Sequence, residues 1–166
     1  MVIYKGLLFK PFTEQDIDIY APIMKRSFDE DTKRHTEDSS GGPDGYDNGD
    51  FLRKWYLHKD VTSFSIYQGE RPIGAVALWI KSNNENILGN IFIDNDLQDG
   101  GLGMTIWEFV ENSYPNAKKW STETPIFSRR NHNFYVNKCG FHIIKIVKPK
   151  DEKDGSFVLE KVMHIE

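Results

Sequence analysis

A glycine-rich turn in the middle of the chain limits the possible folds more than any other feature. An apolar run at residues 91–93 leads through Gln98-Asp-Gly-Gly-Leu-Gly103 into a helical repeat. Glycines let the backbone approach a ligand closely, and the unpaired amides of a helix N-terminus attract phosphate. We therefore predict a strand, a phosphate-binding loop and a helix in succession, with an ordinary strand-to-helix turn as the alternative.

Two common nucleotide motifs do not fit this turn. A P-loop needs Gly-Lys-Ser/Thr, and no lysine follows these glycines. A dinucleotide fingerprint needs a further glycine where this chain has Ile106.

The residues before the turn predict two helices followed by a three-stranded antiparallel meander. A helix begins after Thr13 and Asp16, a variant capping box, and Pro22 is expected to kink or split it. In the longest strand, Ile73, Ala75, Ala77 and Trp79 are expected on one face. The expected strands cover residues 4–12, 62–66, 71–80 and 86–94, and the helices cover 17–28 and 51–56.

The residues after the turn predict two helices among three further strands. Leu102, Ile106, Phe109 and Val110 share one helical face, and this helix ends before Pro115. Strands are expected at 117–122, 141–147 and 156–164, and a helix at 128–138. We predict one α/β domain over residues 1–166, with a mixed, mostly antiparallel sheet flanked by helices and a parallel crossover at the glycine turn.

Composition excludes several classes of protein. The chain has 166 residues, 13% of them aromatic, which is enough for a core, and its single cysteine excludes an internal disulfide. No signal peptide and no apolar run of about 18 residues is present, so we expect a cytoplasmic protein without a membrane span. A net charge of −4 argues against nucleic-acid binding, and the five histidines lack the spacing of metal ligands.

The acidic charge is concentrated in one segment. Residues 29–50 hold eight acidic and two basic residues, a net charge of −6, so the rest of this −4 chain carries +2. The segment is rich in glycine and has Tyr46 as its one large apolar group, so we expect a long loop, either solvated or functional.

Two motifs resemble those of the GNAT acyltransferases. Gln98-Asp-Gly-Gly101-Leu-Gly103 is similar to the family's Gln/Arg-x-x-Gly-x-Gly/Ala motif. About 30 residues later, the stretch from Asn131 through Phe134-Tyr135 to Gly140-Phe141 is similar to its Asn…Phe-Tyr…Gly-Phe stretch. The resemblance implies the GNAT fold over nearly the whole chain.

The resemblance also implies a cosubstrate, acetyl-CoA, and roles for particular residues. The strand at Phe92 and Ile93, with Asn131, would hold the pantetheine arm, and Tyr135 would protonate the leaving thiolate. Glu123 is the candidate general base, with a solvent-relayed proton as the alternative. The loop that would bind the pyrophosphate comprises Gln98, Asp99, Gly100, Gly101, Leu102, Gly103 and Met104.

This chain departs from the family pattern at two points. Tyr135 stands five residues before Gly140, whereas four is usual, so the helix end carries one extra residue that could displace the Tyr135 hydroxyl. Packing in the core is therefore the alternative to an acid role for Tyr135. Asp94, Asp96 and Asp99 surround the expected phosphate loop, where many relatives carry basic residues.

We interpret the chain as an N-acetyltransferase in which an amine attacks acetyl-CoA directly. Asp44, Tyr46 and Asp47 of the acidic segment are expected to attract a cationic acceptor, either a small molecule or a protein amine. The alternatives are an inactive CoA-binding sensor and an acyltransferase that uses another acyl-CoA or a hydroxyl acceptor. The sequence leaves a homodimer open.

Overall fold

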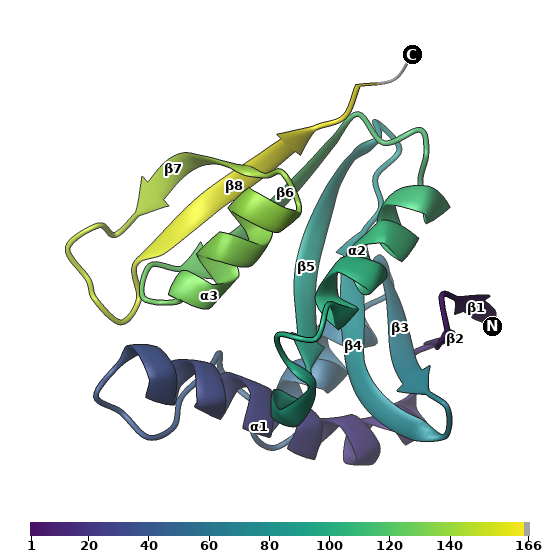
Figure 1. Ribbon diagram of the computed structural model, residues 1–166, viewed down its shortest axis with the longest axis horizontal. Coiled ribbons are helices and arrows are strands. Elements are labelled where there is room, and N and C mark those ends of the chain that lie inside the picture. Colours follow the sequence, from purple (N-terminus) through teal and green to yellow (C-terminus); the bar gives the residue numbers. More distant parts are fainter. Residues whose placement is uncertain (165–166) are drawn as a thin grey trace.

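An eight-stranded mixed sheet organises the molecule, as the computed structural model of residues 1–164 shows (Figure 1). Its spatial order is β1-β2-β3-β4-β5-β6-β8-β7, and β5–β6 is the parallel pair. This arrangement confirms the predicted fold class. The strands are β1 (Val2–Tyr4), β2 (Leu7–Pro11), β3 (Val61–Gln68), β4 (Arg71–Trp79), β5 (Glu85–Ile93), β6 (Lys119–Pro125), β7 (His142–Val147) and β8 (Ser156–Val162).

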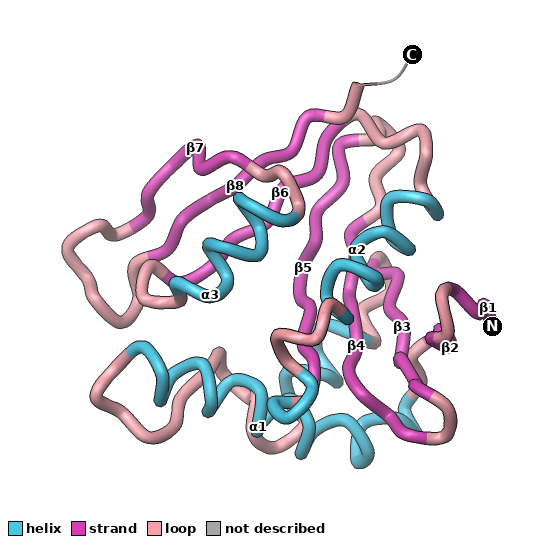
Figure 2. The backbone as a smooth tube through the Cα atoms, in the orientation of Figure 1, coloured by secondary structure: helices cyan, strands magenta, loops and turns pink. Residues whose placement is uncertain are grey.

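The parallel pair holds together at one end only. Glu85–Ile87 of β5 pairs with Lys119–Ser121 of β6. Beyond these residues β5 continues beside β4 and β6 continues beside β8, and Figure 2 shows the two strands separating. The sheet therefore opens toward the end of β5 that leads into the glycine turn.

Helices cover both faces of the sheet, and each face has its own core. Helix α1 (Ile17–His35) and the π-helical segment Leu52–Tyr56 pack against Ala75, Ala77 and Phe92. Helix α2 (Leu102–Ser113) packs on the opposite face through Ile106, Trp107, Phe109 and Val110. The predicted apolar face of this helix is thus confirmed for Ile106, Phe109 and Val110, which are buried, and Leu102 is half-buried.

Two strand predictions need correction. The expected strand 4–12 is a hairpin of β1 and β2, because Lys5 and Gly6 adopt the left-handed turn conformation with φ of 45° and 83°. Ile73 does not share a face with Ala75 and Ala77, because an irregularity in the β3–β4 register shifts it into the α2-side core.

Two predictions near the N-terminus are also wrong in part. Pro22 does not split the helix, because Tyr20 and Met24 on either side of it are anchored in the same core. The acidic segment is not a loop throughout: α1 continues to His35 and includes Asp29, Glu30 and Asp31.

The predicted helix at 128–138 is confirmed as α3 (Arg129–His132), which continues directly into a π-helical segment, Asn133–Lys138. Within residues 1–164, no helix combines the length and the apolar character needed to cross a membrane.

Candidate active site

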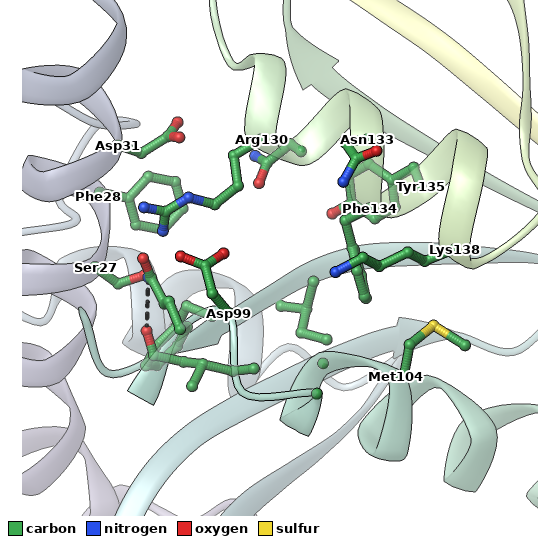
Figure 3. A pocket seen from close by; sticks show the side chains of 17 residues that line it. Ser27, Phe28, Asp31, Asp99, Met104, Arg130, Asn133, Phe134, Tyr135 and Lys138 are labelled. Carbon is green, nitrogen blue, oxygen red and sulfur yellow. Dashed lines mark hydrogen bonds between the residues drawn. The ribbon is translucent and has the colours of Figure 1, made fainter. Parts of the chain in front are cut away.

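A cavity of about 150 Å³ lies where the sheet opens, between the end of β5, the glycine loop, α1 and the helix that begins with α3 (Figure 3). Nine of the residues predicted from the sequence line it: Phe92, Ile93, Gln98, Asp99, Gly101, Gly103, Met104, Asn131 and Tyr135. The other eight lining residues are Ser27, Phe28, Asp31, Ile91, Arg130, Asn133, Phe134 and Lys138.

The helix that follows the glycine loop begins beside this cavity with unpaired backbone donors. Asp99 and Gly101 adopt left-handed conformations, with φ of 65° and 83°, and α2 begins immediately afterward. No side chain caps this helix, and within the described residues no group accepts from the amides of Leu102, Gly103 or Met104. Such a helix start is suited to an anionic group.

Gly103 is required by packing as well as by the loop. A Cβ atom at this position would lie 2.9 Å from the ring of Phe134, so the absence of a side chain lets α2 approach the helix that carries Phe134. Gln98 holds the loop from the other side, because its Nε2 atom donates to the carbonyl of Ile93 at 3.1 Å and to Ser27 Oγ at 3.2 Å.

The acidic residues around the loop are matched by arginines. The Arg26 guanidinium donates to both carboxylate oxygens of Asp94, at 3.1 and 2.9 Å, and holds the pKa of this buried carboxyl below its usual range. Arg71 pairs with Asp96 at 2.7 Å. The third acid, Asp99, lies 3.6 Å from Arg34, so the acidic charge next to the loop is largely balanced.

Tyr135 lies on the cavity despite the extra residue before Gly140. The π-helical segment Asn133–Lys138 absorbs that residue in a wider turn, in which the amide of Cys139 donates to the carbonyl of Phe134. Tyr135 is buried, and burial raises the pKa of its phenol, with smaller contributions from Cys139 and Asp31. The phenol is therefore a proton donor at neutral pH.

Two other side chains of the same helical region face the cavity. Asn131 lines it while its Nδ2 atom donates to Thr124 Oγ1 at 3.3 Å. In Figure 3 the ammonium group of Lys138 lies beside Phe134, the ring that packs against Gly103 at the start of α2.

Several predicted residues lie outside the cavity lining. Glu123 is exposed and accepts from Ser156 Oγ at 2.9 Å, on the opposite side of β6 from the buried Thr122 and Thr124. Gly100 and Leu102 belong to the loop but do not line the cavity.

The three residues predicted to bind the acceptor also lie outside the cavity lining. Asp44 and Asp47 are exposed. Tyr46 is half-buried and donates to Asp29 Oδ1 at 2.5 Å, and burial together with Asp29 raises its pKa to about 12. The acidic loop is therefore tied to α1 rather than folded into the site.

The residue that sequence reasoning missed is Asp31. It lines the cavity from α1, and its Oδ1 atom accepts from Ser128 Oγ at 2.9 Å. The helical repeat contained a signal for it, because Asp31 follows the buried Met24 by seven residues and Phe28 by three, which places all three on one helix face. Because Asp31 lies in a run of acidic residues, the charge pattern assigns it to the acidic loop and not to a helix face.

Comparison with known proteins agrees with the fold. Residues 25–141 match the Acetyltransferase (GNAT) family, and the chain belongs to this family. It is 34% identical over 109 residues to the uncharacterized protein YrkN of Bacillus subtilis. That match covers 65% of this chain and 58% of the length of YrkN, so it spans little more than half of that relative.

Solved structures share the fold at low sequence identity. An acetyltransferase from Thermus thermophilus has a TM-score of 0.72 at 17% identity, covering 97% of this chain and 100% of its own. The PaiA N-acetyltransferase of Thermoplasma acidophilum, solved in complex with coenzyme A, has a TM-score of 0.70 at 14% identity, covering 95% of this chain and 99% of its own.

Proposed function

We propose that this protein transfers an acetyl group from acetyl-CoA to an amine. The observation that carries the proposal is that one cavity brings together the unpaired amides at the start of α2, the end of β5 that has separated from β6, and the Tyr135 phenol. Membership of the GNAT family and the coenzyme A complex of PaiA support it.

The residues on the cavity fit a CoA thioester. The loop from Gln98 to Met104 would hold the pyrophosphate through its amides, and Lys138 adds a positive charge on the same side. Phe92 and Ile93 end a strand whose outer edge is no longer paired with β6, so its backbone can hydrogen-bond an extended pantetheine arm. Asn131 would add a contact to that arm.

The cosubstrate supplies an activated acetyl group as a thioester. The protonated acceptor first loses one proton to solvent and becomes a neutral amine. Its nitrogen then forms the new C–N bond while the C–S bond breaks, the nitrogen loses a second proton and the sulfur gains one. Tyr135 would give its proton to the departing sulfur, because its phenol is protonated and lines the cavity. We do not assign a role to Glu123, which is exposed on the other side of β6, and the amine proton would leave through solvent.

The acceptor is proposed to be an amine that is protonated in solution. The exposed Asp44 and Asp47, with Tyr46, lie outside the cavity and would act on a cationic acceptor only through long-range attraction.

Release of the CoA thiol, measured with acetyl-CoA and a panel of primary amines, tests the proposal. We expect amine-dependent thiol release that stops when acetyl-CoA is omitted. Calorimetric titration of CoA belongs in the same experiment: binding without turnover would instead indicate a sensor module. Turnover with other acyl-CoA compounds or only with alcohols would indicate a different acyltransferase.

A further inference from the structure

Four charged side chains line the cavity: Asp31, Asp99, Arg130 and Lys138. Asp99 belongs to the glycine loop and lies 3.6 Å from Arg34, whereas Asp31 and Arg130 are not paired with each other. Asp31 faces the cavity from α1 and Arg130 faces it from α3, and Figure 3 shows both on the Phe28 side.

Among residues 1–164 no ion pair joins Asp31 and Arg130. The Oδ1 atom of Asp31 accepts a hydrogen bond from Ser128 Oγ and lies 3.6 Å from His35 Nε2. The Nη2 atom of Arg130 is buried without any hydrogen-bond partner.

A buried guanidinium nitrogen without a partner is costly, so its position indicates a ligand. The phosphates of a CoA molecule are not the best explanation for Arg130. The Arg130 side chain extends toward Phe28 and Asp31, whereas Lys138 lies beside Phe134, which packs against Gly103 at the start of α2 (Figure 3).

The two charges together discriminate between kinds of amine. A polyamine could place one ammonium group at Asp31, but a second positive charge nearby would be repelled by Arg130. An α-amino acid carries an ammonium group and a carboxylate on neighbouring atoms, which complements a carboxylate and a guanidinium facing the same space. The charge pattern therefore favours a zwitterion over a polycation.

We propose that the acceptor is an α-amino acid, whose ammonium group is bound by Asp31 and whose carboxylate is bound by Arg130. This inference rests on the proposed acetyl transfer and specifies its substrate class. Both residues bind the acceptor, on the wall of the cavity opposite the start of α2.

The test compares three L-amino acids with the amines that they yield on decarboxylation: alanine with ethylamine, leucine with isoamylamine, and phenylalanine with phenethylamine. Spermidine serves as the polycation. We expect kcat/KM for the best amino acid to exceed that of its amine by about tenfold or more. Arg130→Gln should remove this preference, and Asp31→Asn should raise the KM of both members of a pair with little change in the KM of acetyl-CoA.

Matched variants separate binding from structural effects. Arg129→Gln and Asp18→Asn change exposed residues on the same two helices and should leave the preference intact. Ser128→Ala removes the hydrogen bond to Asp31 but keeps its charge, so it should affect the acceptor KM less than Asp31→Asn. Ser128→Ala and Asp31→Asn could instead change the KM of the acceptor, the KM of acetyl-CoA and Tm equally. That result would show that Asp31 only links α1 to Ser128, and it would overturn the inference.

Failure of the inference differs from failure of the proposed function. Efficient use of spermidine or of the simple amines, with no preference for amino acids, would overturn the inference while acetyl transfer stands. If no acceptor turns over, calorimetric titration of the same compounds into CoA-saturated protein decides the inference. Binding of amino acids that is lost in Arg130→Gln would support it, and absence of such binding would overturn it.

Discussion

The two walls of the cavity are built by different means. On one wall, backbone amides of the glycine loop and the start of α2 face the cavity, and their position is fixed by left-handed residues and by the lack of a side chain at Gly103. On the other wall, charged side chains from α1 and α3, which are about a hundred residues apart in sequence, face the same space. A backbone-built wall suits a cosubstrate of constant structure, and a side-chain-built wall can change its specificity through single substitutions.

The largest effect is expected at Tyr135, which lines the same cavity. Tyr135→Phe keeps the buried ring and removes the proton donor, so kcat should fall about 100-fold with little change in the KM of acetyl-CoA. Because burial raises the pKa of this phenol, kcat of the unmodified protein should not decline through loss of the Tyr135 proton as pH rises toward 10. An unchanged kcat in the variant would remove Tyr135 from the chemistry.

The ion pairs of Asp94 with Arg26 and Arg71, next to the glycine loop, should contribute to the free energy of unfolding. Asp94→Asn weakens the pairing with Arg26 and Arg71, and we expect a loss of about 2 kcal/mol in the free energy of unfolding at pH 7. The pKa of Asp94 is lowered in the folded protein, so its contribution is present above the unfolded pKa and is lost as pH falls through the folded pKa. Urea denaturation should show the two proteins converging in acid; a constant difference down to pH 2 would contradict this assignment.

A smaller effect is expected at Gly103, which tests the backbone-built wall. Gly103→Ala places a methyl group 2.9 Å from the Phe134 ring, which must shift and change the spacing of α2. We expect the Kd of acetyl-CoA to rise about fivefold, measured by calorimetry. Gly100→Ala should have less effect, because its nearest contact would be the carbonyl of Leu97 at 3.5 Å. Equal effects at both positions would show that the Phe134 contact is not what makes Gly103 important.

The smallest effect is expected in the acidic loop. Asp44 and Asp47 are exposed and lie outside the cavity, so the double variant Asp44→Asn, Asp47→Asn should change the acceptor KM by less than about twofold at physiological salt. Steady-state kinetics at low and physiological salt will measure this. A tenfold increase in the acceptor KM would show that the acceptor binds at this loop.

The backbone-built wall could be predicted from the sequence, and the side-chain-built wall could not. Gly101 and Gly103 are needed for the local backbone conformation and for close packing. The loop Gln98–Met104 could therefore be predicted as a binding loop from one short segment. Asp31 and Arg130 meet only because the helices converge, and no local pattern encodes that convergence. Similarly, the arginines that balance Asp94 and Asp96 come from α1 and β4, so the sequence showed the acids without their partners.

The helix end at Tyr135 shows a further limit of sequence patterns. Counting residues back from Gly140 indicated a displaced tyrosine, because an α-helix has a fixed number of residues per turn. The π-helical turn at Asn133–Lys138 changes that number locally, and Tyr135 lines the cavity. The extra residue between Tyr135 and Gly140 therefore does not move the Tyr135 side chain away from the cavity.

A crystal structure with acetyl-CoA bound tests the central claim most directly. The account predicts the pyrophosphate on the amides of Leu102, Gly103 and Met104, the pantetheine arm beside Ile91–Ile93, and the thioester sulfur within hydrogen-bonding reach of the Tyr135 hydroxyl. A cosubstrate bound elsewhere, or bound in this cavity with its sulfur beyond the reach of Tyr135, would contradict it.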